Sequence, residues 1–193
     1  VSFPAFLLGR DPSARVVCAS HTQPLADYFS SKTRAIMRED WYKEVFPKTQ
    51  MDPGYDTKSD FITTLHGGRM ATSVGGAITG RGGNFILVDD PQKPDEVDSE
   101  TSRKTVIDWF QNTLLSRLDN KSEDCIIVVM QRLHEDDLAG HLIRSGGWHH
   151  LNLAAIAKVD EEIRLSKETT YKREAGEVLH PARDGRETLD RIK

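Results

Sequence analysis

NFILVDDP, residues 84 to 91, joins four consecutive apolar residues to a pair of aspartates and a proline. An apolar run with branched side chains is typical of a strand buried on both faces of a parallel sheet. Asp89 and Asp90 follow where this strand is expected to end, and Pro91 cannot extend its hydrogen-bond ladder. Because ligands bind at the carboxyl ends of strands in open α/β sheets, the pair is a candidate for holding Mg²⁺ and activating water. The alternative is an acidic turn in which an aspartate caps the next helix.

Two further apolar runs, residues 14–20 and 124–130, predict buried strands that also end in polar residues. The segments between the three strands have apolar residues at helical spacing. One helix is expected to begin after Thr22, and a longer helix after Ser99, with Trp109 on its buried stripe. Strands that alternate with helices in this way predict an α/β fold with a mainly parallel, doubly wound sheet flanked by helices.

The remaining segments complete this expectation. Apolar residues 1–8, closed by a glycine, look like the last turns of a helix that began before residue 1. Residues 60–65 and 69–74 predict a β-hairpin, and the polar residues 47–59 a surface loop. Residues 148–157 predict a fourth strand or a strand–helix segment that closes the main domain.

The C-terminal extension, residues 158–193, is charged and predicts a meander followed by a short terminal helix. The domain boundary is therefore expected between residues 157 and 158.

Composition narrows the function classes. The 193 residues carry 26 Lys and Arg against 30 Asp and Glu, a net charge of −4, so the chain is not a general binder of polyanions. Cys18 and Cys125 both lie in apolar runs and are expected to be buried, reduced thiols. No run approaches the ~20 apolar residues that span a membrane, and no leader peptide is recognisable. We therefore expect a cytoplasmic protein.

Residues 75–83 contain five glycines and one arginine, Arg81. Glycines let backbone N–H groups approach an anion, and arginine adds a planar charged fork. Because this segment leads directly into the strand that ends at Asp89, Arg81 is expected within reach of that edge or of a neighbouring subunit. The alternative is a flexible loop with a solvated arginine.

The third strand is followed by Gln131 and then by an acidic run, Glu135 to Asp137, that opens a helix. Acidic residues in a first helical turn favour the helix dipole, so capping alone accounts for them. His134, with His149 and His150, lacks the spacing of a metal-binding motif.

These motifs together resemble one family. The segments are GRDP (9–12), VCASH (17–21), TSVGGAITGRG (72–82), VDDP (88–91) and QRLHEDDLAG (131–140), in the family's order over most of residues 1–182. The chain resembles the ATPase domain of the large terminase subunit of tailed phages and prophages. The combination of GGAITGRG, DDP and HEDDLAG is the specific part of this resemblance.

The resemblance implies a fold, a reaction and partners. The fold would be a RecA-like P-loop NTPase core over residues 1–157. Asp89 would be the Mg²⁺ ligand and Asp90 the carboxylate that activates water, Arg81 an arginine finger acting in cis or across a ring, and Gln131 a sensor of the γ-phosphate. The cofactors would be ATP and Mg²⁺, and the partners double-stranded DNA, the terminase small subunit, the portal protein and further copies in a ring. The location would be the cytoplasm of a bacterial host.

The chain also departs from this family. It has no G-x-x-x-x-G-K-[ST] segment, and residues 1–8 resemble the helix that follows one. The family's nuclease domain is also absent. ATP binding by this chain alone is therefore expected to be very weak. A fragment of a helicase-like translocase and a non-catalytic remnant are the alternatives.

Overall fold

The computed structural model describes residues 1–76, 78 and 80–192, and divides them into two compact units. The first unit is Val1–Gly146 and the second begins at Gly147. The structure thus places the division after Gly146, whereas the sequence pattern sets it after residue 157.

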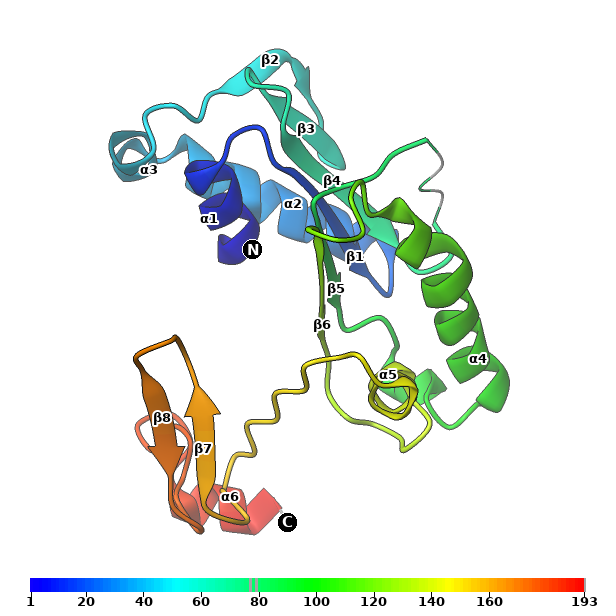
Figure 1. Ribbon diagram of the computed structural model, residues 1–193, viewed down its shortest axis with the longest axis vertical. Coiled ribbons are helices and arrows are strands. Elements are labelled where there is room, and N and C mark those ends of the chain that lie inside the picture. The colour runs from blue at the N-terminus through cyan, green and yellow to red at the C-terminus, as the bar shows by residue number, and fades with distance from the viewer. Residues whose placement is uncertain (77, 79, 193) are drawn as a thin grey trace. The chain divides into compact units, whose positions relative to one another are not determined.

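A six-stranded sheet in the order β2-β3-β4-β1-β5-β6 forms the centre of the first unit (Figure 1). Its strands are β1 (Arg15–Ser20), β2 (Met51–Asp56), β3 (Asp60–Thr63), β4 (Gly68–Ser73), β5 (Phe85–Asp89) and β6 (Cys125–Val129). β1 pairs in parallel with β4 and β5, and β5 pairs in parallel with β6. β3 runs antiparallel to both β2 and β4, which confirms the predicted hairpin.

Helices cover this mostly parallel sheet. They are α1 (Ser2–Arg10), α2 (Gln23–Arg38), α3 (Asp40–Val45), α4 (Glu100–Trp109) and α5 (Leu138–Ser145), with a 3₁₀ turn at Pro94–Glu96. α1 and α2 lie on one side of the sheet and α4 on the other (Figure 1). The predicted mixed α/β fold is confirmed.

The helix starts follow the expected capping residues. Ser99 precedes α4 and its hydroxyl accepts a hydrogen bond from the backbone N–H of Ser102. Thr22 precedes α2, although its side chain makes no capping bond. α4 ends in a π turn (Phe110–Leu114) and a 3₁₀ turn (Leu115–Arg117) instead of continuing as one regular helix.

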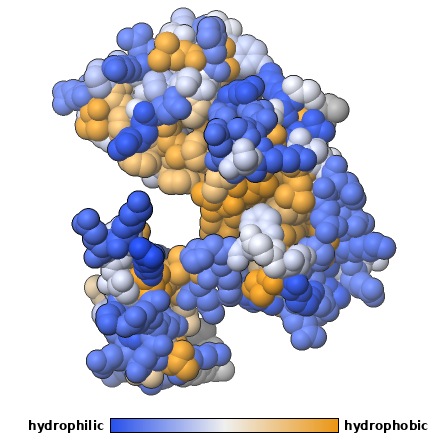
Figure 2. Space-filling model, viewed as in Figure 1, coloured by the Kyte–Doolittle hydropathy of each residue, from blue (hydrophilic) through white to orange (hydrophobic). Residues whose placement is uncertain are grey.

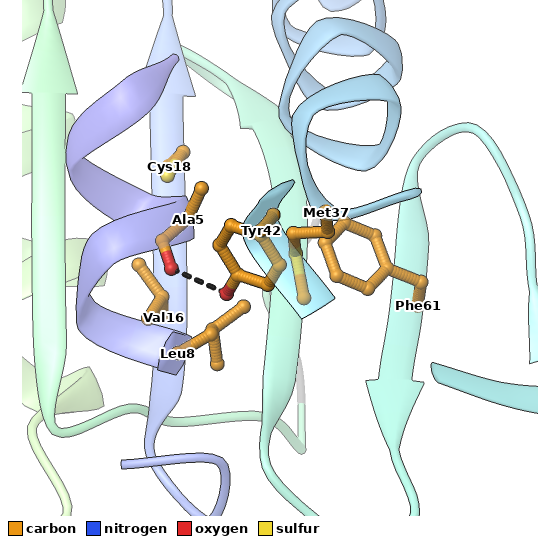
Figure 3. Packing of buried hydrophobic residues seen from close by; sticks show 7 residues of the cluster. All are labelled: Ala5, Leu8, Val16, Cys18, Met37, Tyr42 and Phe61. Atoms are coloured by element: carbon orange, nitrogen blue, oxygen red, sulfur yellow. Dashed lines mark hydrogen bonds between the residues drawn. The ribbon is translucent and has the colours of Figure 1, made fainter. Parts of the chain in front are cut away.

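The core on the α1 side is organised around Tyr42 (Figure 3). Tyr42 is 1% exposed, and its hydroxyl donates a 2.7 Å hydrogen bond to the carbonyl oxygen of Ala5 in α1. Burial raises the pKa of Tyr42 to about 12. The surrounding buried side chains are Ala5, Leu8, Val16, Cys18, Met37 and Phe61. The hydrogen bond fixes α1 against α3.

The other side of the sheet is closed by α4. Phe85 and Leu87 face the Tyr42 core, so Ile86 and Val88 point to the opposite side, and both are buried. Trp109 is 6% exposed, which confirms its predicted burial.

Three predictions about the first unit were wrong. Residues 47–59 contain a strand, β2, where a loop was expected; Pro53 is tolerated there because β2 is an edge strand with one unpaired side. β6 is not fully buried, and Cys125 is exposed instead of buried. The errors about β6 and Cys125 have one cause. β6 forms the other edge of the sheet, and strand order cannot be inferred from a local apolar run.

The second unit holds the antiparallel strands β7 (Glu161–Arg164) and β8 (Thr170–Arg173) and the helix α6 (Arg186–Ile192). The predicted meander and terminal helix are therefore confirmed. The predicted strand or strand–helix at residues 148–157 is wrong: only an isolated bridge at Ile156 forms there, and Leu151 is exposed. In the parts of the chain that the structure describes, every helix is too short or too polar to cross a membrane.

Candidate functional site

The carboxyl ends of four neighbouring strands meet in one row. Ser20 of β1 lies in register with Ser73 of β4 on one side and with Asp89 of β5 on the other. Asp89 is in turn in register with Val129 of β6. The residues that follow these strands, among them Asp90, therefore emerge along the same edge of the sheet.

Asp90 is held in one orientation by its neighbours on both sides. Its backbone N–H donates to the carbonyl of Val129 at 2.9 Å, and its carbonyl oxygen lies 3.3 Å from Nδ1 of His21. Its carboxylate accepts a hydrogen bond from the backbone N–H of Gln131, with Oδ1 and N 3.3 Å apart. Its φ of 42° is unusual for a residue other than glycine. These contacts fix an exposed carboxylate between the ends of β1 and β6.

Asp89 lies directly beside this carboxylate. Burial raises the pKa of Asp89 above its ordinary value, the negative charge of Asp90 raises it further, and the Val1 amino group lowers it. Neither aspartate forms an ion pair within the described residues. Two adjacent carboxylates without an ion-pair partner are an arrangement that a bound metal ion would stabilise.

The N-terminal end of α1 approaches the same edge. Val1 lies close enough for its amino group to act on Asp89, and both residues line one cavity of about 270 Å³. The first N–H groups of a helix carry a partial positive charge and favour anions. The residues at the sheet edge thus combine a pair of acids with the positive end of a helix.

A structured loop holds Gln131 in place after β6. Asp137 is fully buried, and its carboxylate accepts hydrogen bonds from the backbone N–H groups of Leu133 (3.1 Å) and Gly140 (2.8 Å). Arg132 forms an ion pair with it at 3.2 Å. A Cβ on Gly140 would lie 2.0 Å from the carbonyl oxygen of Glu135, so only glycine fits. Asp137, the last residue of the acidic run, therefore caps α5 and fixes the loop, whereas Glu135 and Asp136 lie before the helix and not in its first turn.

The structure does not bring Arg81 together with the two aspartates. Arg81 forms an ion pair with Asp60 of β3, and its guanidinium lies 5.7 Å from the ring centre of Tyr55 in β2. It lines a cavity with Arg15 and Gly68, the first residues of β1 and β4. The cavity opens at the amino edge of the sheet and extends to Asp60, which is in register with Met70 in the middle of β4, whereas Asp89 lies at the carboxyl edge.

The glycine-rich segment explains this position. A Cβ on Gly82 would lie 2.3 Å from Oδ1 of Asp119, and the N–H of Gly83 donates to the carbonyl of Arg117 at 2.9 Å. The segment therefore crosses from the end of β4 to the amino edge before β5 begins. Ala77 and Thr79 of the GGAITGRG motif lie outside the described residues.

A Mg²⁺ ion suits this edge better than a transition metal does. Within the described residues no three His, Cys, Asp or Glu side chains come together as a metal-binding group. Mg²⁺ is commonly bound by one or two carboxylates, with phosphate oxygens and water as its other ligands. Asp89 fits this role because burial and the neighbouring charge of Asp90 raise its pKa, and a bound cation would relieve both effects.

Sequence reasoning missed two residues of this region. His21 contacts the backbone of Asp90, and the only sequence signal was its position directly after the β1 strand. The role of Asp137 as the anchor of the Gln131 loop was hidden within a run of acidic residues. No family model and no curated protein matched this chain when it was compared with both.

Proposed function

We propose that this chain is the ATPase core of a DNA-packaging motor of the terminase large-subunit type, with a RecA-like P-loop NTPase fold. One observation carries the proposal: Asp89 and Asp90 stand together at the carboxyl edge of a parallel sheet, and the backbone of Gln131 fixes the second carboxylate. The motif resemblance assigns the same three positions to metal binding, water activation and phosphate sensing.

The two aspartates divide the chemistry. When bound, Mg²⁺ neutralises charge on the phosphates of ATP. Asp89 would hold the ion, because its carboxylate is partly desolvated and makes no ion pair among the described residues. Asp90, which is tethered to Gln131, orients a water molecule toward the γ-phosphate and accepts its proton.

Gln131 connects this chemistry to the rest of the first unit. Its N–H bonds Asp90, and the loop that follows is tied to α5 through Asp137. A change at the γ-phosphate that moves Asp90 therefore displaces the Gln131 loop. In the proposed motor this displacement changes the grip on double-stranded DNA.

Arg81 acts across a subunit boundary in this proposal. It lies at the amino edge, paired with Asp60, and so does not reach the Asp89 edge of its own chain in this conformation. Packing of copies in a ring can bring the amino edge of one subunit to the carboxyl edge of the next. The small terminase subunit and the portal protein are the further partners of such a ring in a bacterial cytoplasm.

Nucleotide binding tests the proposal. The two proteins to compare are this chain and a version extended upstream through a phosphate-binding loop. We expect Mg²⁺-dependent ATP binding by the extended protein that Asp89→Ala abolishes, while the control Asp95→Ala, in an exposed turn, leaves it unchanged. ATP binding that is equally strong without Mg²⁺ or with Asp89→Ala would contradict the proposal and favour a non-catalytic remnant.

A further inference from the structure

Arg69, in β4, is a buried arginine without a counter-ion. It is 2% exposed, and its Nε and Nη1 have no hydrogen-bond partner. Within the described residues no carboxylate forms an ion pair with it. A guanidinium cannot lose its proton in a protein, so a buried one needs an anion or carbonyl oxygens to compensate its charge.

The other buried arginines have such partners. Nη1 of Arg103 donates to the carbonyls of Val97 (2.7 Å) and Asp98 (3.0 Å). Arg173, in the second unit, forms an ion pair with Glu161 at 3.0 Å. Arg69 therefore differs from both in its lack of compensation, although all three are buried.

The guanidinium of Arg69 lies at the cavity beneath α1. Arg69 is in register with Val16, so its side chain leaves the sheet on the α1 face. Its backbone segment also borders the amino-edge cavity, but its guanidinium contacts the thiol of Cys18, which lines the α1 cavity and not the amino-edge cavity. That cavity has a volume of about 270 Å³, enough for a small ion and water.

The cavity is open to solvent along an apolar rim. Phe3 and Val129 line it and are 43% and 59% exposed. Figure 2 shows apolar side chains gathered over β5 and β6, where the rim lies. A small solute can therefore enter from the carboxyl edge.

Asp89 lines the same cavity but does not compensate Arg69. Among the described residues no ion pair joins its carboxylate to the guanidinium, and Nε and Nη1 of Arg69 have no hydrogen-bond partner. Cys18 is not the counter-ion either, because burial raises the pKa of its thiol and keeps it neutral. Nε and Nη1 of Arg69 therefore remain available to a further acceptor.

We propose that the cavity beneath α1 binds a small oxyanion, a phosphate or carboxylate group, through the unpaired guanidinium nitrogens of Arg69. Charge-assisted hydrogen bonds from arginine to oxyanions are among the stronger ones in proteins, and a buried setting strengthens them. Cys18 and Phe29 form the wall of the site. Asp89, the proposed Mg²⁺ ligand, lines the same cavity, but the inference rests on the guanidinium of Arg69 and its test uses neither Mg²⁺ nor ATP.

Thermal unfolding of this chain in the presence of inorganic phosphate, at constant ionic strength with chloride, tests the site. We expect phosphate to raise the Tm of the wild type in a saturable manner. Arg69→Met removes the response, and Arg69→Lys weakens the phosphate Kd about tenfold or more, because the fork is lost. A parallel titration with acetate identifies the source: a response to phosphate alone assigns a phosphoryl group, and a response to both assigns any small oxyanion.

Arg103→Met is the matched control, since it also removes a buried arginine. It should lower the Tm in chloride because two carbonyls lose their donor, yet keep the phosphate response. Arg69→Met should not lower the Tm in chloride, because it removes an uncompensated charge. A wild type without a response to either anion, or a response that survives Arg69→Met, would overturn the proposal. In NMR spectra the Arg69 Nε–Hε signal should move with phosphate, and an unmoved signal would also contradict it.

Discussion

Replacing Trp109 by alanine tests the packing of α4 on the sheet. Trp109 is 6% exposed, so the substitution removes nearly a whole buried indole, a loss of about 3–5 kcal/mol in the free energy of unfolding. A domain of this size changes its Tm by about 2–4 °C per kcal/mol, so the Tm should fall by about 6–20 °C. Far-UV circular dichroism during heating measures this without relying on tryptophan fluorescence.

Trp41→Ala is the matched control, because Trp41 is 54% exposed and its ring packs edge-on against that of Tyr42. Its loss should cost under about 1.5 kcal/mol. If Trp109→Ala unfolds the chain at room temperature, Trp109→Leu retains part of the packing and should show an intermediate Tm. Equal Tm changes for Trp109→Ala and Trp41→Ala would refute the packing of α4 on the sheet through Trp109.

The remaining predictions concern the site and the core. Asp89 has a folded-state pKa above its unfolded-state value, so its ionisation destabilises the fold as pH rises through that pKa. In urea titrations, Asp89→Asn should therefore be more stable than the wild type at neutral pH and equally stable at about pH 3. Mg²⁺ should stabilise the wild type and not Asp89→Asn. In a protein that contains a phosphate-binding loop, Arg81→Ala should lower kcat about 10³-fold and leave the nucleotide Kd within a few-fold of the wild-type value. Mixing this variant with Asp90→Ala protein should restore part of the turnover. An unchanged kcat would show that Arg81 has no catalytic role. This chain alone should hydrolyse ATP no faster than background, and robust turnover that disappears with Asp89→Ala would reveal another phosphate site. Tyr42→Phe should lower the free energy of unfolding by about 0.5–1.5 kcal/mol in urea titrations, and an unchanged value would mean that its bond to α1 adds nothing.

Local patterns predicted most of the regular structure of the first unit. The strand before Asp89, the hairpin of β3 and β4 and the capping by Ser99 each depend on a few consecutive residues, and all are present. β2 was missed because Pro53 and Gly54 are unfavourable in a strand that pairs on both sides. An edge strand such as β2 pairs on one side only and therefore tolerates them.

Features that depend on distant pairing could not be predicted. Cys125 is exposed because β6 ends the sheet, and no neighbouring residue encodes that order. Arg81 lies at the amino edge because Asp119 and Arg117 hold the end of its loop, more than thirty residues along the chain. Arg69 resembled any residue at the start of a strand, and only its burial without a partner marks it.

The hydrolysis rate of Asp90→Asn, in a protein that joins this chain to a phosphate-binding loop, tests the central claim most directly. Asparagine keeps the size of the side chain and tolerates a φ of 42°, so the bond to Gln131 and the fold should persist. We expect Mg²⁺–ATP binding close to that of the wild type and turnover reduced about a hundredfold or more. Wild-type turnover in Asp90→Asn would show that the carboxylate does not activate water and would contradict the proposed ATPase site.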